Sequence, residues 1–143
     1  MADIFHLFPI NAGIETVYKN ISTPVGLNNW WTKNCEGKPF TGEIYQLHFG
    51  NQYQWQGMVT KHEINCAFEL TIIKADADWL DSKVGFLLNA NNQFTQVDFY
   101  HTGWKENNAH YKTSNYCWAM YLRILKRFSE FGETIKYDDR LNA

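Results

Sequence analysis

Apolar and polar residues alternate through much of the stretch from Thr41 to Trp104, and no other feature of the chain restricts its fold as strongly. A period of two residues places one set of side chains on a single face of a β-strand. Turns expected at Gly50-Asn51 and Asn91-Asn92 separate the alternating runs. Strands so close in sequence pair with their neighbours, so the pattern predicts an antiparallel meander with one solvated face. The predicted inward positions are Tyr45, Leu47 and Phe49; Tyr53, Trp55, Gly57 and Val59; Cys66, Phe68, Leu70 and Ile72; Val84, Phe86 and Leu88; and Val97, Phe99 and His101.

A long amphipathic helix is predicted after the meander. Ser114 or Asn115 can cap its start, and Gly132 can end it. At about 1.5 Å per residue the helix is roughly 25 Å long, enough to cross a strongly curved sheet. Residues 133–143 are polar and are expected to form a loosely ordered tail. The apolar stripe of the helix consists of Cys117, Tyr121, Ile124, Leu125 and Phe128, widened by Trp118 and Leu122.

The beginning of the chain predicts a strand over residues 3–10 and then two short helices. Asn11 can cap the first helix, whose apolar positions Ile14, Val17, Tyr18 and Ile21 follow a helical period. Thr23 followed by Pro24 is a start signal for the second, which leads through Leu27 to the Trp pair. The whole order is that of an α+β protein. Because no flexible linker or repeat interrupts it, residues 1–143 are expected to form a single domain.

Charge and composition exclude several classes of function. The net charge of the 143 residues is −2, which provides no basic field for nucleic acid or for an anionic membrane surface. The chain shows neither a signal peptide nor a run long enough to span a membrane, and its three cysteines are widely spaced. These features favour a cytoplasmic protein with reduced thiols. Aromatic residues make up 17% of the chain, which indicates either a thick core or a cavity lined by rings.

Three segments of the sequence carry a resemblance to a known superfamily. The first includes Ala12, Glu15, Val17 and Tyr18, followed by Pro24, Leu27, Trp30 and Trp31. The second is TQVDFYHTGW, with His101, Gly103 and Trp104, and the third is CWAMYLRILKRFSEFGE. In this order they resemble the START-like (SRPBCC) superfamily, in its branch related to the activator of the heat-shock-protein-ninety ATPase.

The resemblance implies a helix-grip fold, also called START-like or birch-pollen-allergen-like. In this fold a curved antiparallel sheet wraps around the long C-terminal helix, with two short helices after the first strand. Members of the superfamily bind lipids, hormones or polyketides, carry out aromatase or cyclase chemistry, or assist a chaperone. The fold alone therefore does not decide the function.

Inward strand positions and the helix stripe together predict the lining of a cavity between sheet and helix. We expect Trp30 to form part of a lid over this cavity, and Trp31 to lie at its rim or under the first helix. The alternative is that both Trp rings are packed between helices and sheet, and that the large rings simply fill the core. The candidate ligand-binding residues are Trp30, Trp55, Phe68, Phe86, Phe99, His101, Trp118, Tyr121 and Leu125.

His101 is the one candidate for acid–base chemistry, because an imidazole titrates near neutral pH. Its other interpretation is a neutral core histidine with a hydrogen bond to the backbone. Glu69 and Asp98 have outward parity and do not face it. His62 and Cys66 lack further ligands at zinc-like spacing, and no phosphate loop or dinucleotide fingerprint occurs, so no metal or cofactor is expected.

The leading hypothesis is a protein that binds a small hydrophobic or aromatic molecule, without established catalysis. One alternative is a co-chaperone that contacts a chaperone or another protein through its surface. Another is a cyclase, dehydratase or hydrolase that uses His101 with a pocket tyrosine.

Overall fold

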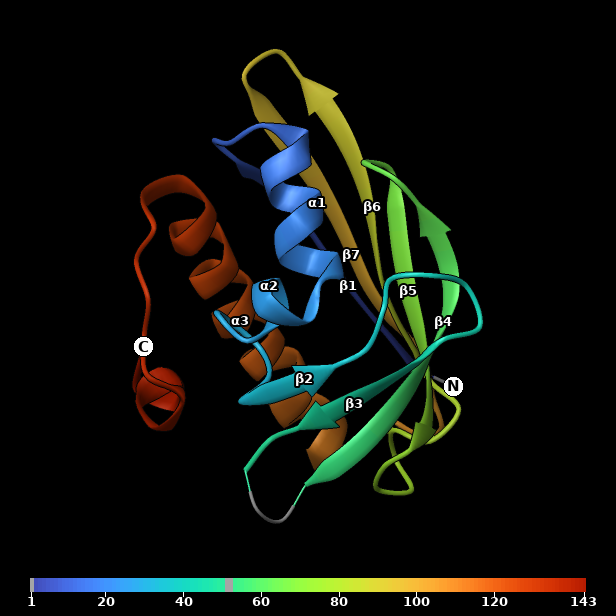
Figure 1. Ribbon diagram of the computed structural model, residues 1–143. Coiled ribbons are helices and arrows are strands. Elements are labelled where there is room, and N and C mark those ends of the chain that lie inside the picture. Colours follow the sequence, from blue (N-terminus) through green and yellow to red (C-terminus); the bar gives the residue numbers. More distant parts are fainter. Residues whose placement is uncertain (1, 51–52) are drawn as a thin grey trace.

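The computed structural model describes residues 2–50 and 53–143, and its main element is an antiparallel sheet of seven strands in the order β1-β7-β6-β5-β4-β3-β2 (Figure 1). The predicted meander is therefore present, since each strand from β2 to β6 pairs with the next one along the chain. The turn expected at Gly50-Asn51 reaches a residue outside the described ranges. The strands are β1 (Ala2–Ile10), β2 (Asn34–Glu36), β3 (Ile44–His48), β4 (Gln54–Glu63), β5 (Ala67–Lys74), β6 (Lys83–Asn91) and β7 (Phe94–Trp104).

Two short helices follow β1, as predicted: α1 (Ile14–Ser22) and α2 (Pro24–Leu27). Gly13, and not Asn11, is the N-cap of α1, because the chain turns into the helix two residues later than expected. Thr23 caps α2 through its side-chain oxygen, which accepts from the Gly26 N–H at 3.0 Å. Gly26 lets α2 lie directly on α1: a Cβ there would come within 2.4 Å of the Lys19 carbonyl oxygen.

The long helix α3 (Ala109–Phe131) lies against the concave side of the sheet, where the Trp118 and Phe99 ring centroids are 4.6 Å apart (Figure 1). This arrangement confirms the helix-grip fold. The helix ends at Gly132 as predicted, with φ 70°, but it begins earlier than Ser114 or Asn115. Asn108 is the actual cap, accepting from the Tyr111 N–H at 2.9 Å, and the first turn is too polar to show an apolar period.

The C-terminal segment departs from the expectation of a loose tail. It contains a short 3-10 helix, η1 (Tyr137–Asn142), and the Arg140 side chain is buried. The Arg140 guanidinium donates to the carbonyl oxygens of Asn28, Thr32 and Ile135 at 2.6, 3.2 and 3.2 Å. These bonds hold the segment against the residues that follow α2. Because the partners of Arg140 are backbone carbonyls, no pattern of side chains in the sequence predicts this contact.

The alternation predicted the inner face of the sheet well, and its outer face only in part. Asp98 is exposed as expected, but Glu69, also on the outer face, is only 6% exposed. The Glu69 carboxylate accepts hydrogen bonds from Thr60 and Tyr100, and Lys83 lies 3.8 Å away. Burial opposes its ionisation, but these hydrogen bonds and the lysine charges outweigh burial and lower its pKa. Cys66, predicted to point inward, is exposed because it lies in the turn after β4.

Candidate functional site

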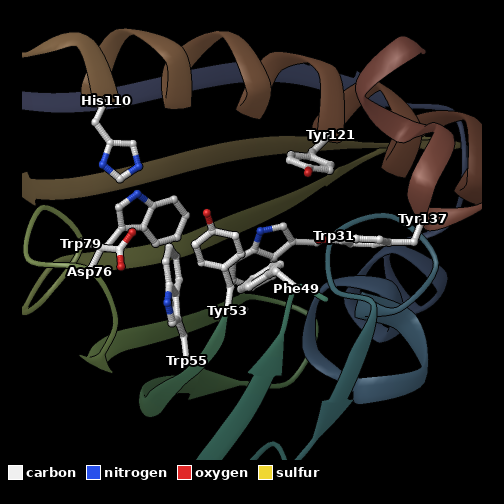
Figure 2. Close-up of a pocket in the computed structure, with 9 residues that line it drawn as sticks. All are labelled: Trp31, Phe49, Tyr53, Trp55, Asp76, Trp79, His110, Tyr121 and Tyr137. Carbon is white, nitrogen blue, oxygen red and sulfur yellow. The ribbon is translucent and has the colours of Figure 1, made fainter. Parts of the chain in front are cut away.

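An open cleft of about 270 Å³ lies where the C-terminal segment, α3 and the loops at one end of the sheet meet (Figure 2). Seven of its nine lining residues are aromatic, and they come from separate parts of the chain. An adjoining hollow of about 320 Å³ shares part of this wall and extends along α3 to Ser114, Cys117 and Trp118. The cleft is lined by Trp31, Phe49, Tyr53, Trp55, Asp76, Trp79, His110, Tyr121 and Tyr137.

The rings of the wall support one another. The Trp55 ring centroid lies 4.9 Å from that of Trp79 and 5.9 Å from that of Tyr53. Trp31 lies 5.3 Å from Phe49, with the two ring planes at 58°. Tilted and edge-on contacts at these distances are the favourable geometries for aromatic pairs. Because Phe49 also lies 5.5 Å from Trp55, these five rings form one connected set along the wall.

The polar groups of the cleft lie on its rim and on α3. Asp76 is exposed, and its carbonyl accepts from the Trp79 N–H at 3.0 Å, in the turn that carries both residues. His110 Nδ1 lies 3.0 Å from Asp78 Oδ2, and this hydrogen bond is the main cause that lowers the pKa of Asp78. Burial raises the pKa of Tyr121 to about 12, so its hydroxyl is neutral at physiological pH. Among the described residues that line the cleft there is no Lys or Arg.

His101 does not line the cleft; it is fully buried and all of its hydrogen-bonding capacity is used. The Trp118 indole can only donate, and it does so to His101 Nδ1 at 3.0 Å. The proton of the neutral ring is therefore on Nε2, which donates to Ser82 Oγ at 2.8 Å. Ser82 in turn donates to the Trp79 carbonyl. Burial is the main cause that lowers the pKa of His101 to about 3, so the ring is neutral.

Comparison with known proteins identifies the family of this chain. The model of the family described as Activator of Hsp90 ATPase homolog 1-like protein matches residues 11–130. The chain belongs to this family, whose short name is AHSA1. No curated protein matches it. The family assignment agrees with the resemblance carried by the helix, Trp-pair and final-helix segments.

Solved structures similar to this AHSA1-like chain share its fold over nearly the whole length. The Aha1 dimer from Colwellia psychrerythraea is 28% identical, with a TM-score of 0.84, and the match covers 93% of this chain and 99% of that one. A protein from Bacillus halodurans is 24% identical (TM-score 0.76, 91% and 98% covered). CalU16 from Micromonospora echinospora is 17% identical (TM-score 0.76, 98% and 81% covered).

Of the predicted lining residues of this AHSA1-like chain, Trp55 and Tyr121 line the cleft, and Trp118 lines the adjoining hollow. The others are at most 2% exposed and belong to the packed interior: Trp30, Phe68, Phe86, Phe99, His101 and Leu125. Phe86 and Phe99 illustrate the reason, because their ring centroids are 5.2 Å apart and leave no space between them. The open space lies at one end of the sheet instead of along the whole helix.

The two adjacent tryptophans are both buried, at 0% and 3% exposure, as the alternative interpretation expected, and of the two only Trp31 borders the cleft. Trp30, expected in the lid, is fully buried beneath α1 and donates its indole N–H to the Asn20 carbonyl at 2.9 Å. Trp31, expected at the rim or under α1, stacks on Trp30 at 6.1 Å, packs against Trp118 at 5.3 Å and lines the cleft. One ring therefore completes the core and the other forms part of the site.

Several cleft residues of this AHSA1-like chain carry little signal in the sequence. Trp79 and Asp76 lie in the loop between β5 and β6, and His110 lies in the polar first turn of α3. Tyr137 is in the segment that was expected to be loose. The available signal was a Trp within a short acidic loop, since loops held by a rigid sheet often carry binding residues.

Two further findings concern classes of site. Within residues 2–50 and 53–143 of this AHSA1-like chain, no three His, Cys, Asp or Glu side chains are grouped so as to hold a metal ion. None of the helices in those ranges has the length and apolar character needed to cross a membrane.

Proposed function

We propose that the chain binds a small aromatic or apolar molecule in the aromatic cleft. The observation that carries this proposal is the open cleft of about 270 Å³ whose wall includes seven aromatic rings. Ligand sites are typically concave, mostly apolar and largely formed in advance. The volume of about 270 Å³ lies just below the usual range of about 300–1,000 Å³, which suits a molecule of one or two rings.

Binding is favoured over catalysis by the position of the titratable groups. His101, the candidate for acid–base chemistry, is sealed behind Trp79 and Trp118, whose rings contact it at centroid distances of 4.5 and 5.9 Å. A general acid or base must reach its substrate directly or through one water. We therefore assign His101 a structural role and propose no reaction.

Truncation of the cleft wall tests the proposal. In Trp55→Ala, loss of the ring that connects Tyr53 to Trp79 is expected to weaken binding of a small aromatic probe by about tenfold. Quenching of tryptophan fluorescence across a library of aromatic molecules measures the affinity, and native mass spectrometry of protein purified from its own host can identify a retained ligand. Tyr116→Ala is the control, because Tyr116 is 78% exposed and does not line the cleft. Equal affinities for both variants would contradict this site.

We also propose a second candidate function, contact with an Hsp90-type chaperone through the outer face of β1. Phe5 and Leu7 are 64% and 66% exposed there, side by side on one face of an edge strand. The family is named for activation of the Hsp90 ATPase, and exposed apolar patches mark protein contacts. The Colwellia relative is a dimer, so a second copy is the competing occupant.

A double substitution distinguishes these occupants. Phe5→Glu with Leu7→Glu is expected to reduce stimulation of the chaperone's ATPase by about fivefold or more, because charges would be buried in an apolar contact. Tyr116→Glu, on α3, is expected to leave the stimulation unchanged. The ATPase rate and the mass of the free protein by light scattering are the measurements. Unaltered stimulation would contradict the chaperone contact. If stimulation is unaltered and only the double variant loses a dimer, the patch is an interface between two copies of the chain.

A further inference from the structure

The charges around the cleft are distributed unevenly. Asp76 is the only carboxylate in its described lining, and in the described part of the chain no Lys, Arg or His lies within ion-pair distance of it. The nearby Lys105 ammonium is held by the carbonyl oxygens of Ala77 and Leu80, at 2.7 and 2.9 Å. The rim at Asp76 therefore carries an exposed negative charge directly beside the aromatic wall.

Two cationic groups lie at the opposite end of the cleft. The Arg140 guanidinium lies 5.3 Å from the Tyr137 ring centroid and the Lys33 ammonium 6.0 Å from it. These two cations already occupy positions over the Tyr137 ring, and they repel a further positive charge at that end. A cationic ligand group is thus directed away from Tyr137 and toward Asp76.

The rings beside Asp76 complete the arrangement. Figure 2 shows Trp79, Trp55 and Tyr53 following one another along the wall, with Asp76 next to Trp79. An aromatic face is electrostatically negative, and an ammonium within about 6 Å of a ring centroid is attracted to it. Several such rings with a carboxylate at the mouth form the kind of site that recognises tertiary and quaternary amines. A neutral ligand without a hydrogen-bond donor gains nothing from Asp76, and an anion is repelled by it.

We propose that the ligand of this cleft is an organic cation, a tertiary or quaternary amine on an aromatic or apolar body, with its ammonium between Asp76, Trp55 and Trp79. The inference rests on the proposed ligand-binding function and adds the charge of the ligand. The apolar body of the ligand then extends toward Trp31, Phe49 and Tyr121.

A matched series of probes tests the inference. Phenethyltrimethylammonium, its neutral carbon isostere (3,3-dimethylbutyl)benzene and the anion 3-phenylpropanoate have similar size and differ mainly in charge. The ammonium is expected to bind about tenfold more tightly than the isostere, and the anion least tightly of the three. Fluorescence titration at low and high salt measures the three affinities.

Variants separate the charge from the shape of the site. Asp76→Asn is expected to weaken ammonium binding several-fold and to leave binding of the carbon isostere unchanged. Asp98→Asn, an equal charge change at an exposed position on the outer face, is the control and should alter neither affinity. Tight binding of the isostere with no preference for the ammonium would overturn the organic cation and leave ligand binding standing. Failure of all three probes to bind would overturn both.

Discussion

Acidification from pH 7 to pH 5 is expected to lower the free energy of unfolding by about 2 kcal/mol through His101 alone. In the folded protein, burial keeps this imidazole neutral down to a pKa of about 3, whereas in the unfolded chain it takes up a proton below its ordinary value of 6.5. Between these two values the unfolded state binds more protons than the folded state. Stability therefore rises with pH across this window and is fully present above pH 6.5.

Urea unfolding at a series of pH values measures the effect. His101→Gln keeps one donor for Ser82 and one acceptor for Trp118, and it does not titrate, so its stability should vary less with pH than that of the parent protein. His48→Gln, at a partly exposed position on β3, is the matched control and should retain the parent's slope. The assignment of the acid sensitivity to His101 would be wrong if both variants kept the same slope.

The same histidine illustrates how far the sequence predicts the fold. Its parity with Val97 and Phe99 correctly placed it on the inner face, because a two-residue period fixes which side of a strand a side chain occupies. Its hydrogen-bond partners are Trp118 on α3 and Ser82, the residue before β6. These bonds therefore depend on tertiary packing that no local sequence pattern encodes. The start of α3 was missed for a related reason, since the cap at Asn108 precedes a polar turn.

The candidate site was predicted less well because parity does not give the position along a strand. Trp55 and Phe99 both have inward parity, but Trp55 lies near the start of β4 and borders open space, whereas Phe99 lies in the middle of β7 and is fully enclosed. The remaining wall comes from several loops, from α3 and from η1. Only the closure of the fold brings these segments together, so the aromatic content indicated a thick core or a lined cavity but not which residues line it.

Replacement of Arg140 by Ala is expected to cost about 3 kcal/mol of stability and to release the C-terminal segment. The guanidinium is 4% exposed, and its three hydrogen bonds join η1 to the carbonyl oxygens of Asn28, Thr32 and Ile135. Hydrogen bonds with a charged partner contribute more than neutral ones, and their loss leaves the buried carbonyl of Thr32 without this donor. Urea unfolding measures the loss in stability.

Release of the segment also removes Tyr137 from the cleft, which connects the stability of η1 to ligand binding. Trypsin should cut after the exposed Lys136 faster in Arg140→Ala than in the parent protein, and the affinity for an aromatic probe should fall with it. Arg140→Lys retains the positive charge but not the planar set of donors, so it should recover only part of the stability. Arg123→Ala, an exposed position on α3, controls for loss of charge. If Arg140→Ala has the same stability to urea and the same rate of cleavage by trypsin as Arg123→Ala, the guanidinium does not hold the segment in place. Tyr137 must then be kept in the cleft by the contacts of its ring alone.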